Sequence, residues 1–174
     1  MNIFRALVIS VLATFLFTTQ IVAQVSEGKF IGSFQTIRQV LDDGRFSCQA
    51  IQCGASCGQG RVFILLGTAK DKYVVPIYNH IFSVAPGAKA KMVIGKQSFE
   101  LVNREKKPSK VLSPADGRTL VGIVRAMLAL EKVNRSGKFQ IIDPKGNKRQ
   151  FSVRGTKAVL KEFNLECKTS LKGY

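Results

Sequence analysis

The stretch KAKMVIGKQSFELV, residues 89–102, decides the fold class of this chain. Two six-residue runs flank the dipeptide Gly95-Lys96, and apolar and polar residues alternate along each run. Alternation with a period of two is typical of a half-buried strand, and a glycine in a two-residue connection allows a tight turn. The residues that could share one buried face are Met92, Ile94, Phe99 and Leu101. The stretch therefore predicts an antiparallel β-hairpin.

The same two-residue period extends over most of the chain. Further candidate strands are residues 30–40, 46–51, 61–66 and 72–78, and turn residues separate them. Pro76 lies inside the last run and indicates an edge strand or a bulge, because proline has no N–H for a ladder hydrogen bond. A second hairpin is predicted from residues 138–142 and 149–153, with its turn at 143–147.

Two segments depart from this period and predict helices. Ser113-Pro114-Ala115-Asp116 indicates a helix start, with Ser113 as the cap and Pro114 at the first helical position. The apolar residues that then recur at helical spacing are Leu120, Val121, Val124, Met127 and Leu128. The second predicted helix begins at Thr156 and ends just before Cys167, and its expected buried residues are Val159, Leu160 and Phe163. The expected fold is mainly β, a single antiparallel β-sandwich-like domain with two short helices.

The first 23 residues indicate export from the cytoplasm. A short start with a positive charge at Arg5 precedes an apolar run over residues 6–17, and Ala23 is a small residue at which a signal peptidase would cut. A membrane anchor is the alternative, but the apolar run is well short of the roughly 20 residues that cross a bilayer. We therefore expect a signal peptide at 1–23 and one mature domain at 24–174.

The mature chain is strongly basic. Removal of 23 residues from 174 leaves 151, the usual size of one domain with one core. Only Arg5 is lost from 27 Lys and Arg, so 26 face 11 Asp and Glu and the net charge is +15. Such a surplus attracts polyanions over about 8–10 Å at ordinary salt.

Export changes the partners that this charge predicts. Nucleic acid is the expected polyanion inside a cell, whereas lipid headgroups, lipopolysaccharide phosphates, acidic glycans and host surfaces are expected outside the cytoplasmic membrane. The densest cluster is Lys106, Lys107 and Lys110 beside Arg104, in a loop that also holds Glu105. We expect these four basic residues to contact an anionic surface or an envelope protein. A well-solvated basic surface without a specific partner is the alternative.

The four cysteines agree with export. Cys48, Cys53, Cys57 and Cys167 are even in number, and disulfides persist outside the cytoplasm. Three connectivities are possible. One alternative is a zinc site that three of these thiols form with His80, but their spacing lacks a paired C-x2-C. Another is a redox site at Cys53 and Cys57, although three residues separate these cysteines where thioredoxin-type chemistry normally has two.

Other patterns do not predict catalysis. The chain has one histidine, His80, so no Ser-His-acid triad can be assembled from the sequence, and the acids are too scattered to choose a pair for glycan hydrolysis. Gly54, Gly58 and Gly60 lack the lysine and hydroxyl of a phosphate loop. We therefore expect no catalytic residue, no metal ligand and no cofactor, and a protein that is not an enzyme.

An ordered set of segments resembles one known family. The segments are Phe46-Ser47-Cys48-Gln49-Ala50, residues 88–99, Ser113-Pro114-Ala115-Asp116 leading into 120–127, Phe151-Ser152-Val153-Arg154-Gly155, Lys157-Ala158-Val159-Leu160 and the terminal Cys167. In this order they resemble the invasion-associated locus B family, exported proteins of alphaproteobacteria. The resemblance covers roughly four fifths of the mature chain.

The resemblance implies a β-sandwich-like domain in the periplasm or at the outer envelope, and secretion from the cell is the alternative. It implies a non-catalytic role in host-cell entry or envelope integrity. It also implies a disulfide between Cys48 and Cys167, which leaves Cys53 and Cys57 as a local pair, and it places Phe34 where the family usually has tryptophan. The alternative function is a periplasmic redox or hydrolytic enzyme that uses the Cys53-Cys57 loop.

Overall fold

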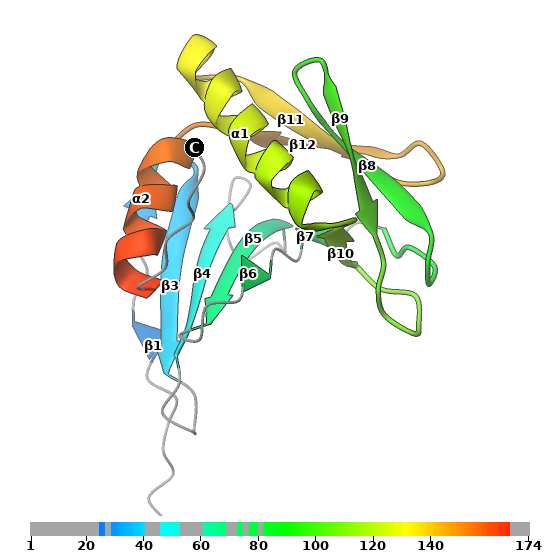
Figure 1. Cartoon of the computed structure of the whole chain (residues 1–174), viewed down its shortest axis with the longest axis horizontal. Coiled ribbons are helices and arrows are strands. Elements are labelled where there is room, and N and C mark those ends of the chain that lie inside the picture. The colour runs from blue at the N-terminus through cyan, green and yellow to red at the C-terminus, as the bar shows by residue number, and fades with distance from the viewer. Residues whose placement is uncertain are drawn as a thin grey trace, which may run out of the picture.

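The computed structural model of the chain describes residues 25–26, 29–40, 46–52, 61–68, 73–74, 77–79 and 82–167. It is mainly β, with antiparallel sheets and two helices in one small domain, as Figure 1 shows. The predicted fold class is therefore confirmed. The predicted signal peptide at 1–23 lies outside the described residues.

Twelve strands and two helices make up the described part of the chain. The strands are β1 Val25–Ser26, β2 Phe30–Ile31, β3 Phe34–Val40, β4 Phe46–Gln52, β5 Arg61–Thr68, β6 Tyr73–Val74, β7 Ile77–Asn79, β8 Lys89–Ile94, β9 Gln97–Val102, β10 Val111–Pro114, β11 Lys138–Ile142 and β12 Lys148–Ser152. The helices are α1 Gly117–Val133 and α2 Thr156–Cys167. The strands pair in the order β1-β3-β4-β5-β7-β10-β9-β8-β11-β12, with β2 on β3 and β6 on β5.

Strand β10 joins the two sheets. Val111 and Leu112 pair with β7, whereas Ser113 and Pro114 pair with Val102 and Leu101 of β9. The sequence did not predict this strand. Its last two residues, Ser113 and Pro114, instead predict a helix start, since serine and proline before an acid are typical of one.

Helix α1 begins later than predicted. The cap is Asp116, whose side chain accepts a hydrogen bond from the Thr119 N–H at 2.7 Å, and the first helical residue is Gly117. Ser113 as the cap was therefore wrong, because Ser113 belongs to the ladder with β9. Val121, predicted for the apolar face, is 38% exposed, and the residues that α1 buries are Ile123, Val124, Ala126 and Met127.

The hairpin β8-β9 has the predicted bounds, and Phe99, expected on its buried face, is half-buried. Ile94 pairs with Gln97, and Gly95 between the strands has a φ of 58°. Met92, Ile94 and Leu101 are at most 2% exposed, as expected for a shared buried face. The second predicted hairpin is formed by β11 and β12, which pair from Lys138 and Ser152 to Ile142 and Lys148.

The predicted strand over residues 30–40 is divided by a turn. Gly32 has a φ of 61° and lies in the turn between β2 and β3, so these two strands form a hairpin. This turn meets the chain that leaves β12. The Ser33 N–H donates to the Arg154 carbonyl at 2.9 Å, and the Gln52 side-chain amide donates to the Ser152 carbonyl. The end of β12 therefore contacts the β2-β3 turn and the end of β4. We call this contact, which Ser33, Gln52, Ser152 and Arg154 form, the seam.

The other predicted elements are found with small shifts. Strands β4 and β5 extend the predicted runs by one and two residues at their C-terminal ends. The predicted run over 72–78 is divided into β6 and β7, which both pair with β5, and Pro76 itself lies outside the described residues. Helix α2 begins at Thr156 as predicted, and its residues Val159, Leu160 and Phe163 are at most 2% exposed.

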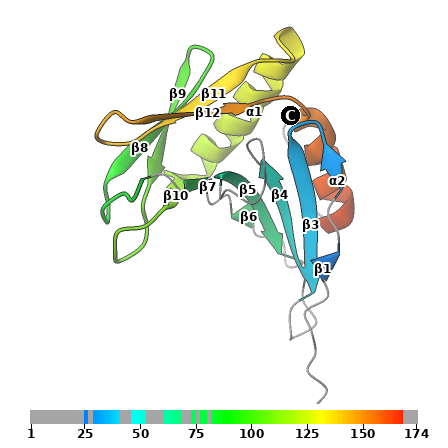
Figure 2. The ribbon, with the colours of Figure 1, turned by 180° about the vertical axis from the view of Figure 1, so that it is seen from behind.

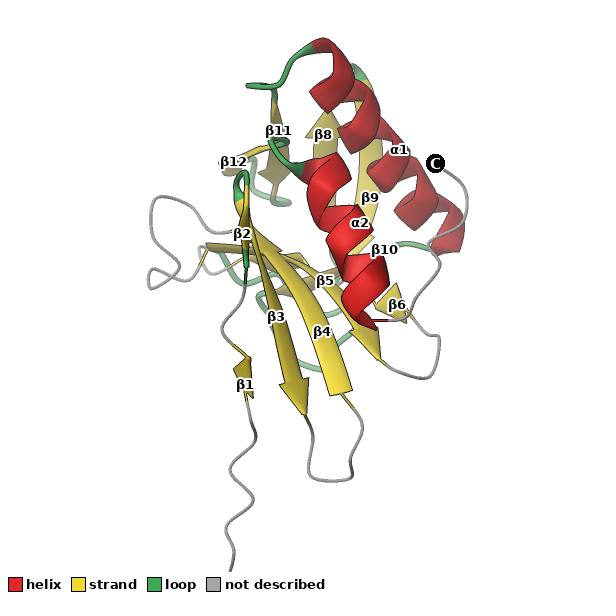
Figure 3. Cartoon of the chain, turned by 90° about the vertical axis from the view of Figure 1, so that its left-hand side faces the viewer, coloured by secondary structure: helices red, strands yellow, loops and turns green. Residues whose placement is uncertain are grey.

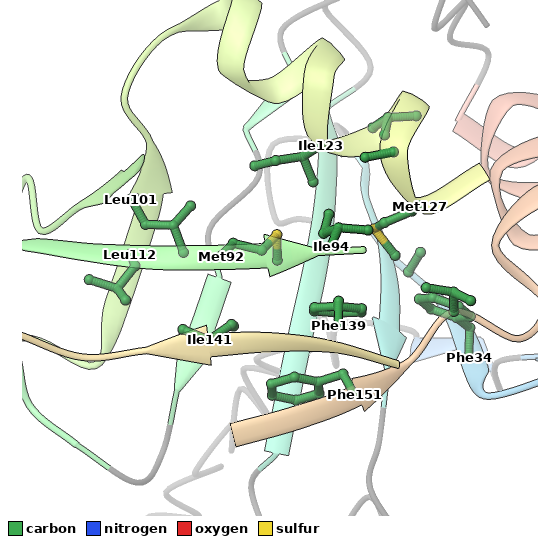
Figure 4. Close-up of a cluster of buried hydrophobic side chains, with 14 of the residues drawn as sticks. Phe34, Met92, Ile94, Leu101, Leu112, Ile123, Met127, Phe139, Ile141 and Phe151 are labelled. Carbon is green, nitrogen blue, oxygen red and sulfur yellow. The ribbon is translucent and has the colours of Figure 1, made fainter. Parts of the chain in front are cut away.

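One hydrophobic core joins the sheets and helices (Figure 4). Phe34 from β3 is 1% exposed and belongs to the same cluster as Met127 of α1 and Phe163 of α2. The rings of Phe139 and Phe151 stack across β11 and β12 with their centroids 5.3 Å apart. Both helices therefore lie on the side of the sheets that faces the core, and the opposite side of β8, β9, β11 and β12 faces solvent. Among the described residues, no helix combines the length and hydropathy that a membrane crossing needs.

Candidate functional site

The loop of residues 103–110 between β9 and β10 is held by a buried asparagine. Asn103 is 1% exposed, and its side-chain N–H groups donate to the carbonyls of Val84 at 2.7 Å and Lys107 at 3.0 Å. Its side-chain oxygen accepts from the Glu105 N–H at 2.8 Å. Val84 and Ser109 also exchange two backbone hydrogen bonds. The loop is thus tied to the neighbouring segment at several points, and its exposed lysines are carried by a fixed backbone.

The structure separates the four predicted contact residues into two kinds. Lys106, Lys107 and Lys110 are exposed and form no ion pair with any described residue. Arg104 instead donates from its guanidinium to the carbonyls of Pro114 and Ala115, just before α1. Arg104 therefore has a structural role in addition to its charge, and the three lysines are the residues free to meet a ligand.

The strand register brings further lysines to the same end of the sheet. Lys89 pairs with Val102, next to the start of the 103–110 loop, and Lys91 pairs with Ile142. Ile142 in turn pairs with Lys148, so Lys91 and Lys148 lie two strand spacings apart, about 10 Å. Lys145 is exposed in the turn between β11 and β12. Sequence reasoning missed these four residues, because only the pairing of distant strands places them beside the predicted loop.

We call this region the basic end. Its cations are Lys89, Lys91, Arg104, Lys106, Lys107, Lys110, Lys145 and Lys148, and its carboxylates are Glu100, Glu105 and Asp143. Eight positive charges against three negative ones give a net charge of +5. The loops of the basic end project together on the right in Figure 1 and on the left in Figure 2.

Two of the three carboxylates of the basic end are already bonded. Glu100 forms an ion pair with Lys89 at 3.0 Å. Asp143 accepts from the backbone N–H groups of Lys145 and Asn147 and from the Asn147 side chain, at 2.7 to 2.9 Å, and so fixes the β11-β12 turn. Apart from Lys89, the lysines of the basic end form no ion pair with a described residue. This arrangement can attract an anionic surface, because such a surface can come close to several of these lysines at once.

The described part of the chain contains one cysteine side chain. Cys48 lies on β4, is 1% exposed and is not a free thiol. It pairs with Arg38 on the face of β3 and β4 that α2 covers, as Figure 3 shows for the helix. Cys53, Cys57, His80 and the Cys167 side chain lie outside the described residues. The pairing of the cysteines and the zinc and redox alternatives therefore stay predictions.

No metal-binding group of three or more His, Cys, Asp or Glu side chains occurs among the described residues. In comparisons with known proteins, no family model, no curated protein and no solved structure matches the chain.

Proposed function

We propose that this chain is an exported, non-catalytic protein of the bacterial envelope that binds an anionic surface or an acidic envelope partner through its basic end. The observation that carries the proposal is the register of β8, β11 and β12, which places Lys89, Lys91 and Lys148 beside the lysine loop. The segment order that resembles the invasion-associated locus B family supports the envelope location and a role in host-cell entry or envelope integrity.

The geometry favours a flat or extended ligand over a small one. The lysines stand on the solvent-facing side of a sheet and in two neighbouring loops. They are spread over several strand spacings, so a membrane or an acidic polymer can meet many of them at once. Each lysine close to an anionic membrane contributes about 1 kcal/mol to binding.

The test is binding to vesicles with and without anionic lipid. Replacement of Lys106, Lys107 and Lys110 by glutamine is expected to remove about 3 kcal/mol of binding free energy, a loss of affinity of about a hundredfold. The matched control replaces Lys96, Lys138 and Arg154 by glutamine, three exposed cations outside both the basic end and the groove between the helices, with the same change in charge. Equal losses in both variants would show that net charge alone drives binding.

Ionic strength supplies an independent measurement. Binding of the unaltered chain should weaken steeply between low and physiological salt, because the exposed charges are screened. An affinity that does not depend on salt would contradict the proposal. Fractionation of cells into cytoplasm, periplasm, outer membrane and culture fluid tests the proposed export.

We also propose that Cys48 is bonded to Cys167. Helix α2 starts beside the seam, near Gln52, and packs along β3 and β4 toward Cys48. A helix rises about 1.5 Å per residue and a strand about 3.3 Å. The 11 steps from Thr156 to Cys167 therefore span about 16 Å and the four steps from Gln52 to Cys48 about 13 Å, which supports a pairing of the two ends. Peptide mapping of the non-reduced protein would identify the bonded pair.

A further inference from the structure

A groove runs between the two helices, away from the basic end. It has a volume of about 920 Å³ and lies between the C-terminal part of α1 and the first three turns of α2. Half-buried Leu128 and exposed Ala158 form its accessible apolar floor, and Leu160, 2% exposed, lies beneath them. The volume falls within the range of about 300–1,000 Å³ that is typical of small-molecule sites.

Four cations line this groove. Lys132 and Arg135 come from the end of α1, and Lys157 and Lys161 from the start of α2. All four are exposed, and none forms an ion pair with a described residue. Lys157 and Lys161 are four residues apart on one helix, a spacing at which like charges repel and destabilise a helix. An anion between them would remove this repulsion.

The groove has one carboxylate, Glu131, beside its four cations, so its lining keeps a positive excess. Glu131 accepts hydrogen bonds from the backbone N–H groups of Gly155 and Lys157, one to each of its oxygens. Glu131 thus links α1 to the start of α2 and accepts hydrogen bonds from backbone N–H groups there that the helix itself leaves without a partner. The groove combines an apolar floor with a positive rim, and this combination differs from a fully solvated basic helix face, which offers no apolar recess.

We propose that the groove binds one molecule of an anionic amphiphile, an aliphatic chain that carries a phosphate. The phosphate would lie between Lys157 and Lys161, and the aliphatic chain would lie along Leu128 and Ala158, above the buried Leu160. Charge complementarity selects the anionic head, and the apolar floor selects the chain. This site is separate from the basic end and does not depend on the function proposed for that region.

The experiment titrates the full chain with n-octyl phosphate below its micelle-forming concentration, followed by calorimetry and by the methyl NMR signals of Leu128 and Leu160. Inorganic phosphate tests the head alone, and n-octanol tests the chain alone. The variant Lys157→Gln/Lys161→Gln removes the proposed head contacts. The control Lys106→Gln/Lys107→Gln makes the same charge change at the basic end.

We expect n-octyl phosphate to bind with saturation, to shift both leucine signals and to bind more tightly than either fragment. The Lys157→Gln/Lys161→Gln variant should bind about tenfold more weakly and the control less than twofold more weakly. A second variant, Ala158→Trp, fills the groove from α2 and should abolish saturable binding with the fold retained by circular dichroism. Equal binding of inorganic phosphate, or equal losses in the two lysine variants, would overturn the proposal.

Discussion

The substitution Gly155→Ala tests the seam that brings β12 back to the β2-β3 turn. Gly155 has a φ of 90°, and a Cβ atom placed on it would lie 2.6 Å from the Ile31 carbonyl oxygen and 3.0 Å from the Gly32 Cα atom. Both of these atoms belong to the backbone, so no side chain can rotate away. The neighbouring hydrogen bond from Ser33 to Arg154 holds the two segments together. The added methyl group must therefore open the seam.

Two costs combine in this variant. A positive φ costs an L-residue about 1–2 kcal/mol relative to its preferred conformations. Overpacking against a fixed backbone adds about 1–3 kcal/mol. We therefore expect Gly155→Ala to lower the free energy of unfolding by about 3–4 kcal/mol, which for a domain of this size lowers the melting temperature by roughly 10 °C.

Gly146→Ala is the matched control. Gly146 has a nearly equal φ of 86°, but a Cβ atom there would meet nothing within 4 Å. It should therefore show the conformational cost alone, about 1–2 kcal/mol. Urea unfolding followed by far-UV circular dichroism measures both variants. If their free energies of unfolding agree within about 0.5 kcal/mol, the seam does not have the close contact that the argument requires.

Three further changes address the helices and the cysteines. Glu131→Ala removes both acceptors for the first turn of α2. It should lower the free energy of unfolding by about 2 kcal/mol and raise the rate of amide hydrogen exchange in the first turn of α2. An unchanged exchange rate there would contradict this role of Glu131. The hydrogen bond from the Thr119 N–H lowers the pKa of the Asp116 carboxyl below its ordinary 3.8. The carboxylate therefore stabilises the fold above the pKa that it has in the unfolded chain, and this stabilisation is lost as the pH falls through its lower pKa in the folded protein. Asparagine also caps helices, so Asp116→Asn should keep the cap at neutral pH but should not show this loss of stability in acid. Urea unfolding across the acidic pH range measures the difference. Cys48→Ser should remove about 4–5 kcal/mol if the bond to Cys167 closes a loop of about 120 residues, and a melting temperature within about 2 °C of the unaltered chain would refute that pairing.

Local patterns predicted the β8-β9 hairpin and α2 well. Both depend on information within a short window: a glycine at a tight turn in the first case, and apolar residues at helical spacing in the second. The start of α1 could not be predicted this way. Ser113 and Pro114 have the composition of a helix start, but their pairing with β9 decides their conformation, and β9 lies more than ten residues away.

The basic end was predicted only in part for the same reason. Lys106, Lys107 and Lys110 are close in sequence and could be recognised as a cluster. Lys91 and Lys148 are far apart in the chain, but they lie only two strand spacings apart in the sheet because each pairs with Ile142. Strand register, which no local window contains, therefore determines the extent of this surface.

Most of the acids in the described part of this basic chain bind other groups of the fold. Asp116 caps α1, Glu131 binds the start of α2, and Asp143 fixes the β11-β12 turn. Glu100 and Glu162 pair with single lysines. Three of these carboxylates bind backbone N–H groups and form no ion pair with a described lysine. Except at Lys89, which pairs with Glu100, an anion can therefore bind the lysines of either place without breaking an ion pair between described residues. Glutamine at these unpaired lysines should change binding far more than it changes stability.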